Sequence, residues 1–405
     1  MKRTYEAAGV KKHSEEDELA RSTKFSGPVF IVGMPRSGTK LLRDLLNNHS
    51  AVGLAPNESH FIPYYYRRLE RFKDLTDLCS FDRFFRDVHK STFYRRLDAA
   101  GLAPDAEPWY ERIEECSAVR GEKPAGGTVA GSILDPAAAL AGNTFAGSIP
   151  GPAGGHSDGS NHPRRPLSTA EWSYATALRV LYQWIADQQG KRMWGDKTPS
   201  YLLHIPLLKR LFPGARFIHI VRDVRDVCLS TRSAMGKNLF RAAQRWHDHI
   251  EVVRRDAAGL AKSEYLEVSY ETLVNVPERV LRRCCDFLEI EFEPEMAVLH
   301  RPSENLGVAR GSLRIVNENT GRWRTALRAG QIQCIERLGM PLMAELGYRP
   351  IYRVEPARLA GWRMKLYKML DGLNLLRFHL RSKTIRDAMR FIRIGVRLSA
   401  KKGYS

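Results

Sequence analysis

The segment Gly33-Met-Pro-Arg-Ser-Gly-Thr-Lys40 has the residue types of a loop that holds a phosphate group. It follows a short apolar run, Pro28 to Gly33, which predicts a buried strand, and it precedes leucines at helical spacing. Between a strand and a helix, a glycine-bearing turn directs backbone N–H groups and the positive end of the helix dipole toward one anion. The segment therefore predicts an anion cradle, whose candidate contacts are Arg36, Ser37, Gly38, Thr39 and Lys40.

This cradle matches the first half of a Walker A loop but departs from the second half. A Walker A loop places Lys directly after its second Gly, whereas here Thr39 precedes Lys40. A magnesium-dependent kinase also needs an acidic residue after a second strand, and the apolar run Ala215 to Val221 leads instead into Arg222. These differences favour a nucleotide other than a magnesium-bound triphosphate. A P-loop-type nucleotide-dependent kinase remains the alternative enzyme class.

Arg222 and Ser230 form a second candidate phosphate site. Arg222 follows the predicted strand 215–221, and Ser230 falls on the second turn of a helix predicted from about Val224 to Ser233. At this separation a guanidinium group and a hydroxyl group can converge on one phosphate. The spacing therefore predicts that the two side chains share an anionic ligand.

Pro35-Arg-Ser-Gly-Thr39, together with Arg222 and Ser230, resembles the donor-binding motifs of sulfotransferases that use 3′-phosphoadenosine-5′-phosphosulfate. The resemblance implies that Arg36 to Lys40 hold the 5′-phosphosulfate and that Arg222 and Ser230 hold the 3′-phosphate. It also implies a P-loop-like α/β fold, in which helices form two layers around a parallel sheet. The chain lacks the Arg-Lys-Gly block of the cytosolic enzymes before Gly321, which favours the Golgi-like and bacterial branches.

Three further positions carry the resemblance. Asn57-Glu-Ser-His-Phe61 is similar to the Glu-x-His-Phe segment of heparan-type sulfotransferases, which implies that Glu58 is the catalytic base. Asp196-Lys-Thr-Pro-Ser-Tyr201 resembles their Lys-Thr-Pro-x-Tyr segment, which implies an active-site role for Lys197. Tyr270 falls where tyrosylprotein-type enzymes place a Tyr near the adenine. Each residue also has a purely structural alternative: a helix-capping acid for Glu58, a solvated lysine for Lys197 and a core position for Tyr270.

The resemblance implies in-line transfer of a sulfuryl group to an acceptor hydroxyl, with 3′,5′-ADP as the product and no metal. Sulfuryl transfer should resemble phosphoryl transfer, so positioning and charge stabilisation do most of the work. Glu58 takes the acceptor proton in this scheme, and Arg36 and Lys197 stabilise the transferring group and the leaving oxygen. The acceptor is expected to be a carbohydrate or lipid hydroxyl, because the segments around Glu58 and Lys197 are similar to those of carbohydrate enzymes.

The elements expected to position these residues alternate between strands and helices, as in a parallel sheet covered by helices. Strands are predicted at 28–33, 215–221 and 265–269, and helices at 39–47, 168–189, 224–233, 241–257 and 277–288. The sequence from Phe61 to about Leu97 has a helical pattern, with aromatic and basic residues interleaved. Asn317 to Arg324 is similar to the Gly-x-Trp-[Lys/Arg] block that closes the sulfotransferase domain.

We expect three regions: a flexible polar N-terminus at 1–26, a sulfotransferase domain at 27–350 and a basic helical extension at 351–405. Residues 120–166 hold ten glycines and six prolines, which predicts a loop insertion within the domain. No apolar run is long enough to span a bilayer, and the start has no apolar signal core. The six cysteines form no CxxC pair, which favours reduced thiols and a cytoplasmic protein.

The net charge of +19 on 405 residues admits an anionic substrate, an anionic membrane surface or nucleic acid as a partner. Residues 353–405 contain fourteen Lys and Arg but only three acidic residues. Because so much of the positive charge lies in this tail, the net charge gives only weak support for a nucleic-acid-binding protein. In this tail Ile385, Met389, Ile392 and Val396 recur at helical spacing, with arginines one residue later. Such a helix can pack its apolar stripe on the core or lie on an anionic inner membrane surface, and both alternatives stay open.

Overall fold

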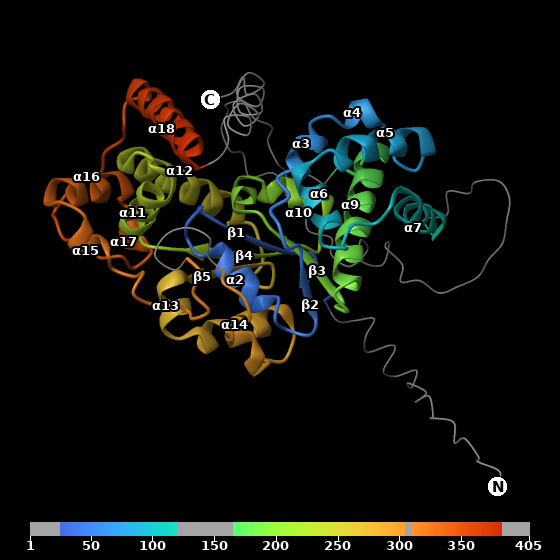
Figure 1. Cartoon of the computed structure of the whole chain (residues 1–405), viewed down its shortest axis with the longest axis horizontal. Coiled ribbons are helices and arrows are strands. Elements are labelled where there is room, and N and C mark those ends of the chain that lie inside the picture. The colour runs from blue at the N-terminus through green and yellow to red at the C-terminus, as the bar shows by residue number, and fades with distance from the viewer. Residues whose placement is uncertain (1–24, 120–164, 304–309, 383–405) are drawn as a thin grey trace, which may run out of the picture.

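The computed structural model describes residues 25–119, 165–303 and 310–382 (Figure 1). Most of the predicted flexible N-terminus and Gly/Pro-rich insertion, and the stripe from Ile385 to Val396, lie outside these residues. The predicted domain limits at 26 and 350 stay predictions.

A five-stranded parallel sheet forms the centre of the described chain. Its strand order is β2-β3-β1-β4-β5, so β1 lies in the middle between β3 and β4. The bounds are β1 Val29–Gly33, β2 Val52–Leu54, β3 Met193–Lys197, β4 Arg216–Val221 and β5 Tyr265–Ser269. The predicted strands 28–33, 215–221 and 265–269 are thereby confirmed as β1, β4 and β5.

Helices cover both faces of the sheet, which gives the expected three layers. Alternate residues of β1 enter different cores: Val29 and Ile31 pack with α2 (Thr39–Leu46) and α14 (Pro277–Leu288), whereas Phe30 and Val32 pack on the opposite face. That period of two is the geometry of a strand buried on both sides. Figure 1 shows α13 (Tyr270–Asn275) and α14 below the sheet, and α10 (Ile205–Leu211) and α12 (Leu239–Ala257) above it.

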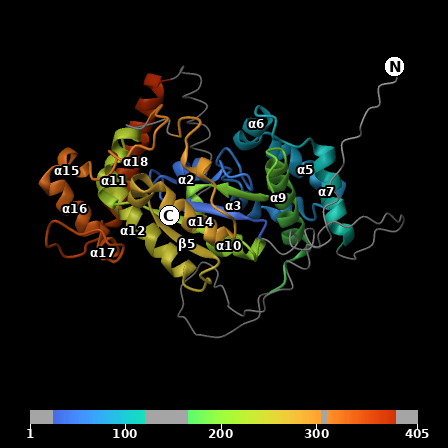
Figure 2. The same ribbon diagram turned by 90° about the horizontal axis from the view of Figure 1, so that it is seen from below.

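The remaining helices gather at the two ends of the sheet (Figures 1 and 2). One group surrounds α9 (Thr169–Asp187), whose N-terminus is closed by a capping box between Ser168 and Glu171. It contains α3 Ile62–Tyr66, α4 Leu69–Phe72, α5 Leu78–His89, α6 Thr92–Asp98 and α7 Ala106–Val119. The other group contains α11 Val224–Met235, α15 Trp323–Ala326, α16 Ala329–Gly339, α17 Leu342–Glu345 and α18 Gly361–Ser382.

Two strands, β2 and β3, are absent from the sequence-based expectation. β3 has the sequence Met-Trp-Gly-Asp-Lys, yet all five residues are buried. Its polar residues are tolerated there because Asp196 and Lys197 have hydrogen-bond partners, as described below. β2 has only three residues, too few for a periodic pattern.

Within the described residues, no helix is both long and apolar enough to cross a membrane.

Candidate functional site

The loop from Met34 to Lys40 joins the end of the central strand β1 to the start of α2. The Ser37 N–H donates to the Met34 carbonyl oxygen over 3.1 Å, which closes a tight turn. Gly38 precedes α2 with φ of 91°, a left-handed conformation that favours glycine. The N–H groups of the first helical turn have no acceptor within the helix. The predicted cradle residues Arg36 to Lys40 therefore form a turn and a helix start with the geometry of an anion site.

Arg36, Arg222 and Ser230 come together beside this loop. Arg36 Nε donates to Ser230 Oγ over 3.2 Å, and Arg222 Nη1 donates to the Arg36 carbonyl oxygen over 2.9 Å. The Arg222 guanidinium also lies over the Tyr270 ring, 4.2 Å from its centroid. Tyr270 in turn packs directly against Gly38. The residues predicted for the two phosphates of the donor thus form one connected cluster.

Two buried polar atoms in this cluster suit an anionic ligand. Within the described residues, Ser37 Oγ and Arg222 Nε have no hydrogen-bond partner. Ser37 is 1% exposed and Arg222 is 6% exposed. Leaving such groups unpaired is costly, and a phosphate oxygen would accept a hydrogen bond from each. The cluster therefore fits a phosphorylated ligand.

Glu58 and Lys197 form an ion pair at the same edge of the sheet. Lys197 Nζ is 2.6 Å from Glu58 Oε1, and His60 Nε2 is 2.9 Å from Glu58 Oε2. Lys197 ends β3 and Glu58 follows β2, and these two strands are paired in the sheet. Lys197 is buried, whereas the Glu58 side chain is 37% exposed. The structure thus brings two of the three predicted catalytic residues, Glu58 and Lys197, into contact and leaves Glu58 accessible.

Burial and neighbouring charges set the protonation of this pair. Burial acts to raise the pKa of Glu58, but the His60 hydrogen bond and the Lys197 charge outweigh it and lower that pKa to about 2. Burial also lowers the pKa of Lys197, although Glu58 opposes this shift. Glu58 is therefore ionised at neutral pH, as a proton acceptor must be.

A buried hydrogen-bond network fixes the segments that carry Glu58 and Lys197. Asp196 accepts hydrogen bonds from Ser59 Oγ, from Tyr182 OH over 2.7 Å and from Thr198 Oγ1 over 3.1 Å. The Ser59 hydroxyl also contacts Tyr201 OH over 2.6 Å. Burial raises the pKa of Asp196, while these hydrogen bonds oppose the rise. Ser59 directly follows Glu58, and Asp196 directly precedes Lys197, so the network holds both catalytic candidates in place.

The segment from Asn317 to Arg324 lies against the Arg222 cluster. Asp226 on α11 accepts hydrogen bonds from the N–H groups of Gly321 over 2.7 Å and Trp323 over 3.1 Å. The Asn319 carbonyl oxygen then accepts from Arg222 Nη2 over 2.7 Å. In this chain, which lacks the Arg-Lys-Gly block, the segment contacts the predicted 3′-phosphate site through a backbone oxygen.

The comparison with known families decides what kind of protein has this geometry. The model of the sulfotransferase family matches residues 28–120 and 151–294, which is more than half of the chain. The chain belongs to the sulfotransferase family. The matched ranges contain Arg36, Glu58, Lys197, Arg222 and Ser230, the residues brought together in the site.

Two curated sulfotransferases match over shorter segments. Protein-tyrosine sulfotransferase 2 of Gallus gallus is 29% identical over 175 residues, 38% of this chain and 46% of that protein. Carbohydrate sulfotransferase 2 of Homo sapiens is 33% identical over 102 residues, 24% of this chain and 19% of that protein. The matches thus span less than half the length of these relatives. Among solved structures, the sulfotransferase domain from the curacin biosynthetic pathway aligns with a TM-score of 0.45 and 20% identity, covering 81% of this chain and 99% of that domain.

Several residues of the candidate site were not predicted as site residues. His60 contacts Glu58, and its backbone φ of 56° is unusual for a residue other than glycine. Asp226 accepts a hydrogen bond from Gly321, and Asp196 accepts one from Tyr182, so each ties its own segment to another part of the chain. The sequence does hold a signal for Asp226: it lies four residues after Arg222 and four residues before Ser230, on the same predicted helix.

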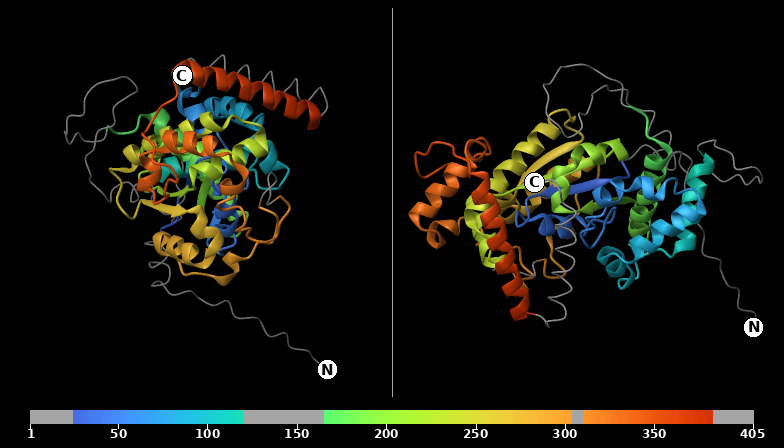
Figure 3. Two further views of the ribbon diagram at one scale, coloured as in Figure 1. Left: turned by 90° about the vertical axis from the view of Figure 1, so that its left-hand side faces the viewer. Right: turned by 90° about the horizontal axis from the view of Figure 1, so that it is seen from above.

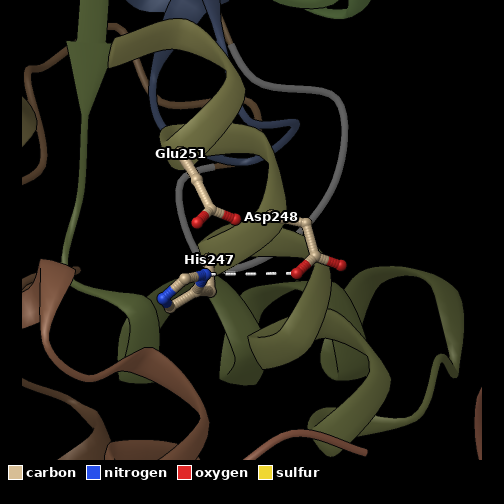
Figure 4. Close-up of side chains that lie close together, drawn as sticks. All are labelled: His247, Asp248 and Glu251. Atoms are coloured by element: carbon tan, nitrogen blue, oxygen red, sulfur yellow. Dashed lines mark ion pairs between the residues drawn. The ribbon is translucent and has the colours of Figure 1, made fainter. Parts of the chain in front are cut away.

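One group of possible metal ligands lies on α12, and Figure 4 shows its three side chains. His247, Asp248 and Glu251 each offer a ligand atom within 4.8 Å of the others, and His247 Nδ1 is 4.0 Å from Asp248 Oδ1. Arg358 donates to His247 Nε2 over 2.8 Å. Burial and this guanidinium lower the pKa of His247. A positive charge in contact with the imidazole opposes a metal cation there, and independence from metal stays a prediction.

Replacing Gly38 by Ala is expected to destabilise the fold of this sulfotransferase by about 1–3 kcal/mol. The added Cβ would lie 2.3 Å from Tyr270 Cδ2, at a backbone φ of 91° that side chains rarely adopt. Chemical denaturation measures the loss. Gly330→Ala on α16 is the matched control, because nothing lies within 4 Å of its Cβ position. Equal stability of the two variants would contradict the tight packing of Tyr270 on the loop.

Asp226→Asn is expected to change how the stability depends on pH. Burial raises the pKa of Asp226 from 3.8 to about 6, with Arg222 limiting the rise. Because the pKa of Asp226 is higher in the folded than in the unfolded protein, its protonated form stabilises the fold. This stabilisation is fully present below about pH 4 and is lost as pH rises through about 6. The stability advantage of the wild type over Asp226→Asn should therefore shrink by up to about 3 kcal/mol from pH 4 to 7. Urea denaturation at each pH tests this, with exposed Asp98→Asn as the control. Parallel wild-type and Asp226→Asn curves would refute it.

Proposed function

We propose that this sulfotransferase moves the sulfuryl group of 3′-phosphoadenosine-5′-phosphosulfate to an acceptor hydroxyl and releases 3′,5′-ADP. The observation that carries the proposal is the Glu58–Lys197 contact of 2.6 Å at the sheet edge where the anion loop and Arg222 also lie. A base and a cation are then available beside a site suited to two phosphate groups. Family membership supports the same chemistry.

The donor would be held by residues from three segments. The loop from Arg36 to Lys40 would bind the 5′-phosphosulfate through backbone N–H groups and the Ser37 hydroxyl. Arg222 and Ser230 would bind the 3′-phosphate, and Tyr270 would adjoin the adenosine. Since Ser230 Oγ accepts from Arg36 Nε, this hydroxyl links the two phosphate sites.

Glu58 is proposed as the general base. Its carboxylate is exposed enough to meet an acceptor hydroxyl and is ionised at neutral pH. As the acceptor oxygen attacks sulfur and the bond from sulfur to the bridging phosphate oxygen breaks, the acceptor proton passes to Glu58. Lys197 and Arg36 would stabilise the negative charge on the sulfuryl and leaving oxygens. Arg36 cannot supply a proton to the leaving group, because guanidinium stays charged.

The acceptor is proposed to be a carbohydrate or lipid hydroxyl. Support comes from the segments around Glu58 and Lys197 and from the match to human carbohydrate sulfotransferase 2. The match to protein-tyrosine sulfotransferase 2 makes a tyrosyl hydroxyl the competing acceptor.

Transfer of ³⁵S from labelled donor to panels of glycans, glycolipids and tyrosine peptides tests the proposal. We expect a labelled product and an equal amount of 3′,5′-ADP, without added magnesium. A parallel reaction with γ-labelled ATP and magnesium tests the kinase alternative. Label transfer from ATP and none from the sulfated donor would overturn the sulfotransferase reaction.

A further inference from the structure

Helix α18 is fixed to the rest of the molecule through polar groups. Asp371 is 5% exposed and accepts hydrogen bonds from Arg241 Nη1 and from the Asn238 N–H, each over 2.7 Å. Asn374 Nδ2 donates to the Gly236 carbonyl oxygen over 2.9 Å. Asp371 and Asn374 are three residues apart and therefore lie on one side of the helix. That side faces the α11–α12 connection, as contacts of α18 with both helices show.

The opposite side of α18 is apolar and exposed. Four of its side chains recur at spacings of four, three and four residues and so form a single line along the helix. We call them the outer stripe: Trp362, Leu366, Met369 and Leu373, which are 64%, 39%, 59% and 48% exposed. Figure 3 shows α18 along the outside of the molecule. A helix that only packs on a core places its apolar side chains inward, whereas α18 carries these four apolar side chains on its outward side.

Basic residues flank the outer stripe. Arg363, Lys365 and Lys368 are exposed on α18. Asp371, the sole acidic residue of the helix, is on the inward side and paired with Arg241. Over the described side chains from Trp362 to Leu373, the outward side of the helix therefore presents apolar side chains flanked by cations. This pattern complements a surface with negative headgroups above an apolar interior.

We propose that α18 lies in the plane of an anionic lipid surface, with the outer stripe inserted and Arg363, Lys365 and Lys368 at the phosphates. A second copy of the chain is a poorer occupant. It would bring like charges together along the outer stripe, since the same cations flank the stripe in both copies. The proposal is independent of the sulfuryl-transfer reaction.

Sedimentation of the full-length protein with vesicles tests this surface. The vesicles contain either phosphatidylcholine alone or equal parts phosphatidylcholine and phosphatidylglycerol. We expect binding to the anionic vesicles, with weakening at high salt. The double variant Trp362→Ser/Leu366→Ser should reduce this binding about tenfold or more, and Lys365→Gln/Lys368→Gln should reduce the preference for phosphatidylglycerol.

Leu78→Ser is the matched control, because Leu78 is an apolar residue with 59% exposure on the distant helix α5. It should bind vesicles like the wild type, and thermal melts should show all variants folded. Absence of wild-type binding to anionic vesicles would overturn the proposal. So would unchanged binding by the Trp362→Ser/Leu366→Ser variant. A wild-type dimer in sedimentation velocity that this variant dissociates, without vesicle binding, would assign the outer stripe to a second copy instead.

Discussion

Glu58→Gln is expected to lower turnover by roughly 10²–10⁴-fold while donor affinity changes little. Gln keeps the size and hydrogen-bonding capacity of the side chain but cannot accept the acceptor proton. The proposed donor contacts come from the loop, Arg222 and Ser230 and do not involve Glu58. Single-turnover transfer assays measure the rate, and calorimetric titration with 3′,5′-ADP measures the affinity.

This variant also removes the partner of the buried Lys197 ammonium. An uncompensated buried charge destabilises a fold, so thermal melts must accompany the rates. Lys197→Met/Glu58→Gln restores charge balance and should recover stability without recovering turnover. Exposed Glu70→Gln serves as the control for loss of a surface carboxylate. Near-normal turnover of folded Glu58→Gln would remove Glu58 from the role of base.

Arg222→Met is expected to weaken binding of 3′,5′-ADP by roughly 30-fold or more, because truncating a buried, hydrogen-bonded charge costs about 2–5 kcal/mol. Binding of 5′-ADP should weaken far less, since that ligand lacks the group assigned to Arg222. The preference for the 3′-phosphorylated ligand should therefore collapse. Calorimetric titration of both ligands gives the ratio directly.

Arg282→Met is the matched control for this measurement. Arg282 is an exposed arginine on α14 that pairs with Glu278 on the same helix. Its loss should leave both affinities unchanged. If Arg222→Met weakened the two ligands equally, Arg222 would act on the loop as a whole through the Arg36 carbonyl rather than on the 3′-phosphate.

The fold could be predicted where side-chain pattern alone specifies an element. β1, β4 and β5 and the helices α2, α11 and α14 are apolar runs or amphipathic repeats, and the structure has them at nearly the predicted bounds. The short helix α13, which directly follows β5, was not predicted. β3 could not be found in this way. Its Asp196 and Lys197 look like loop residues until the partners that satisfy them, more than a hundred residues away for Ser59 and Glu58, are known.

The same limit applies to the site. The loop from Met34 to Lys40 is contiguous, so its residue types were sufficient to predict the turn and helix start that the structure has. The Glu58–Lys197 pair depends on the neighbouring strands β2 and β3, both of which sequence patterns missed. Spacing placed Arg222 and Ser230 near one another, but the hydrogen bond from Arg36 to Ser230 follows from a loop conformation with φ of 75° at Arg36, which no spacing rule specifies.

The most direct test of the central claim is whether the wild-type protein distinguishes a 3′-phosphate. Calorimetric titration without magnesium should show 3′,5′-ADP binding at least about 30-fold more tightly than 5′-ADP, because only the former ligand has the 3′-phosphate assigned to Arg222 and Ser230. Equal affinities for the two ligands, or tighter binding of ATP with magnesium than of 3′,5′-ADP, would contradict the assigned donor.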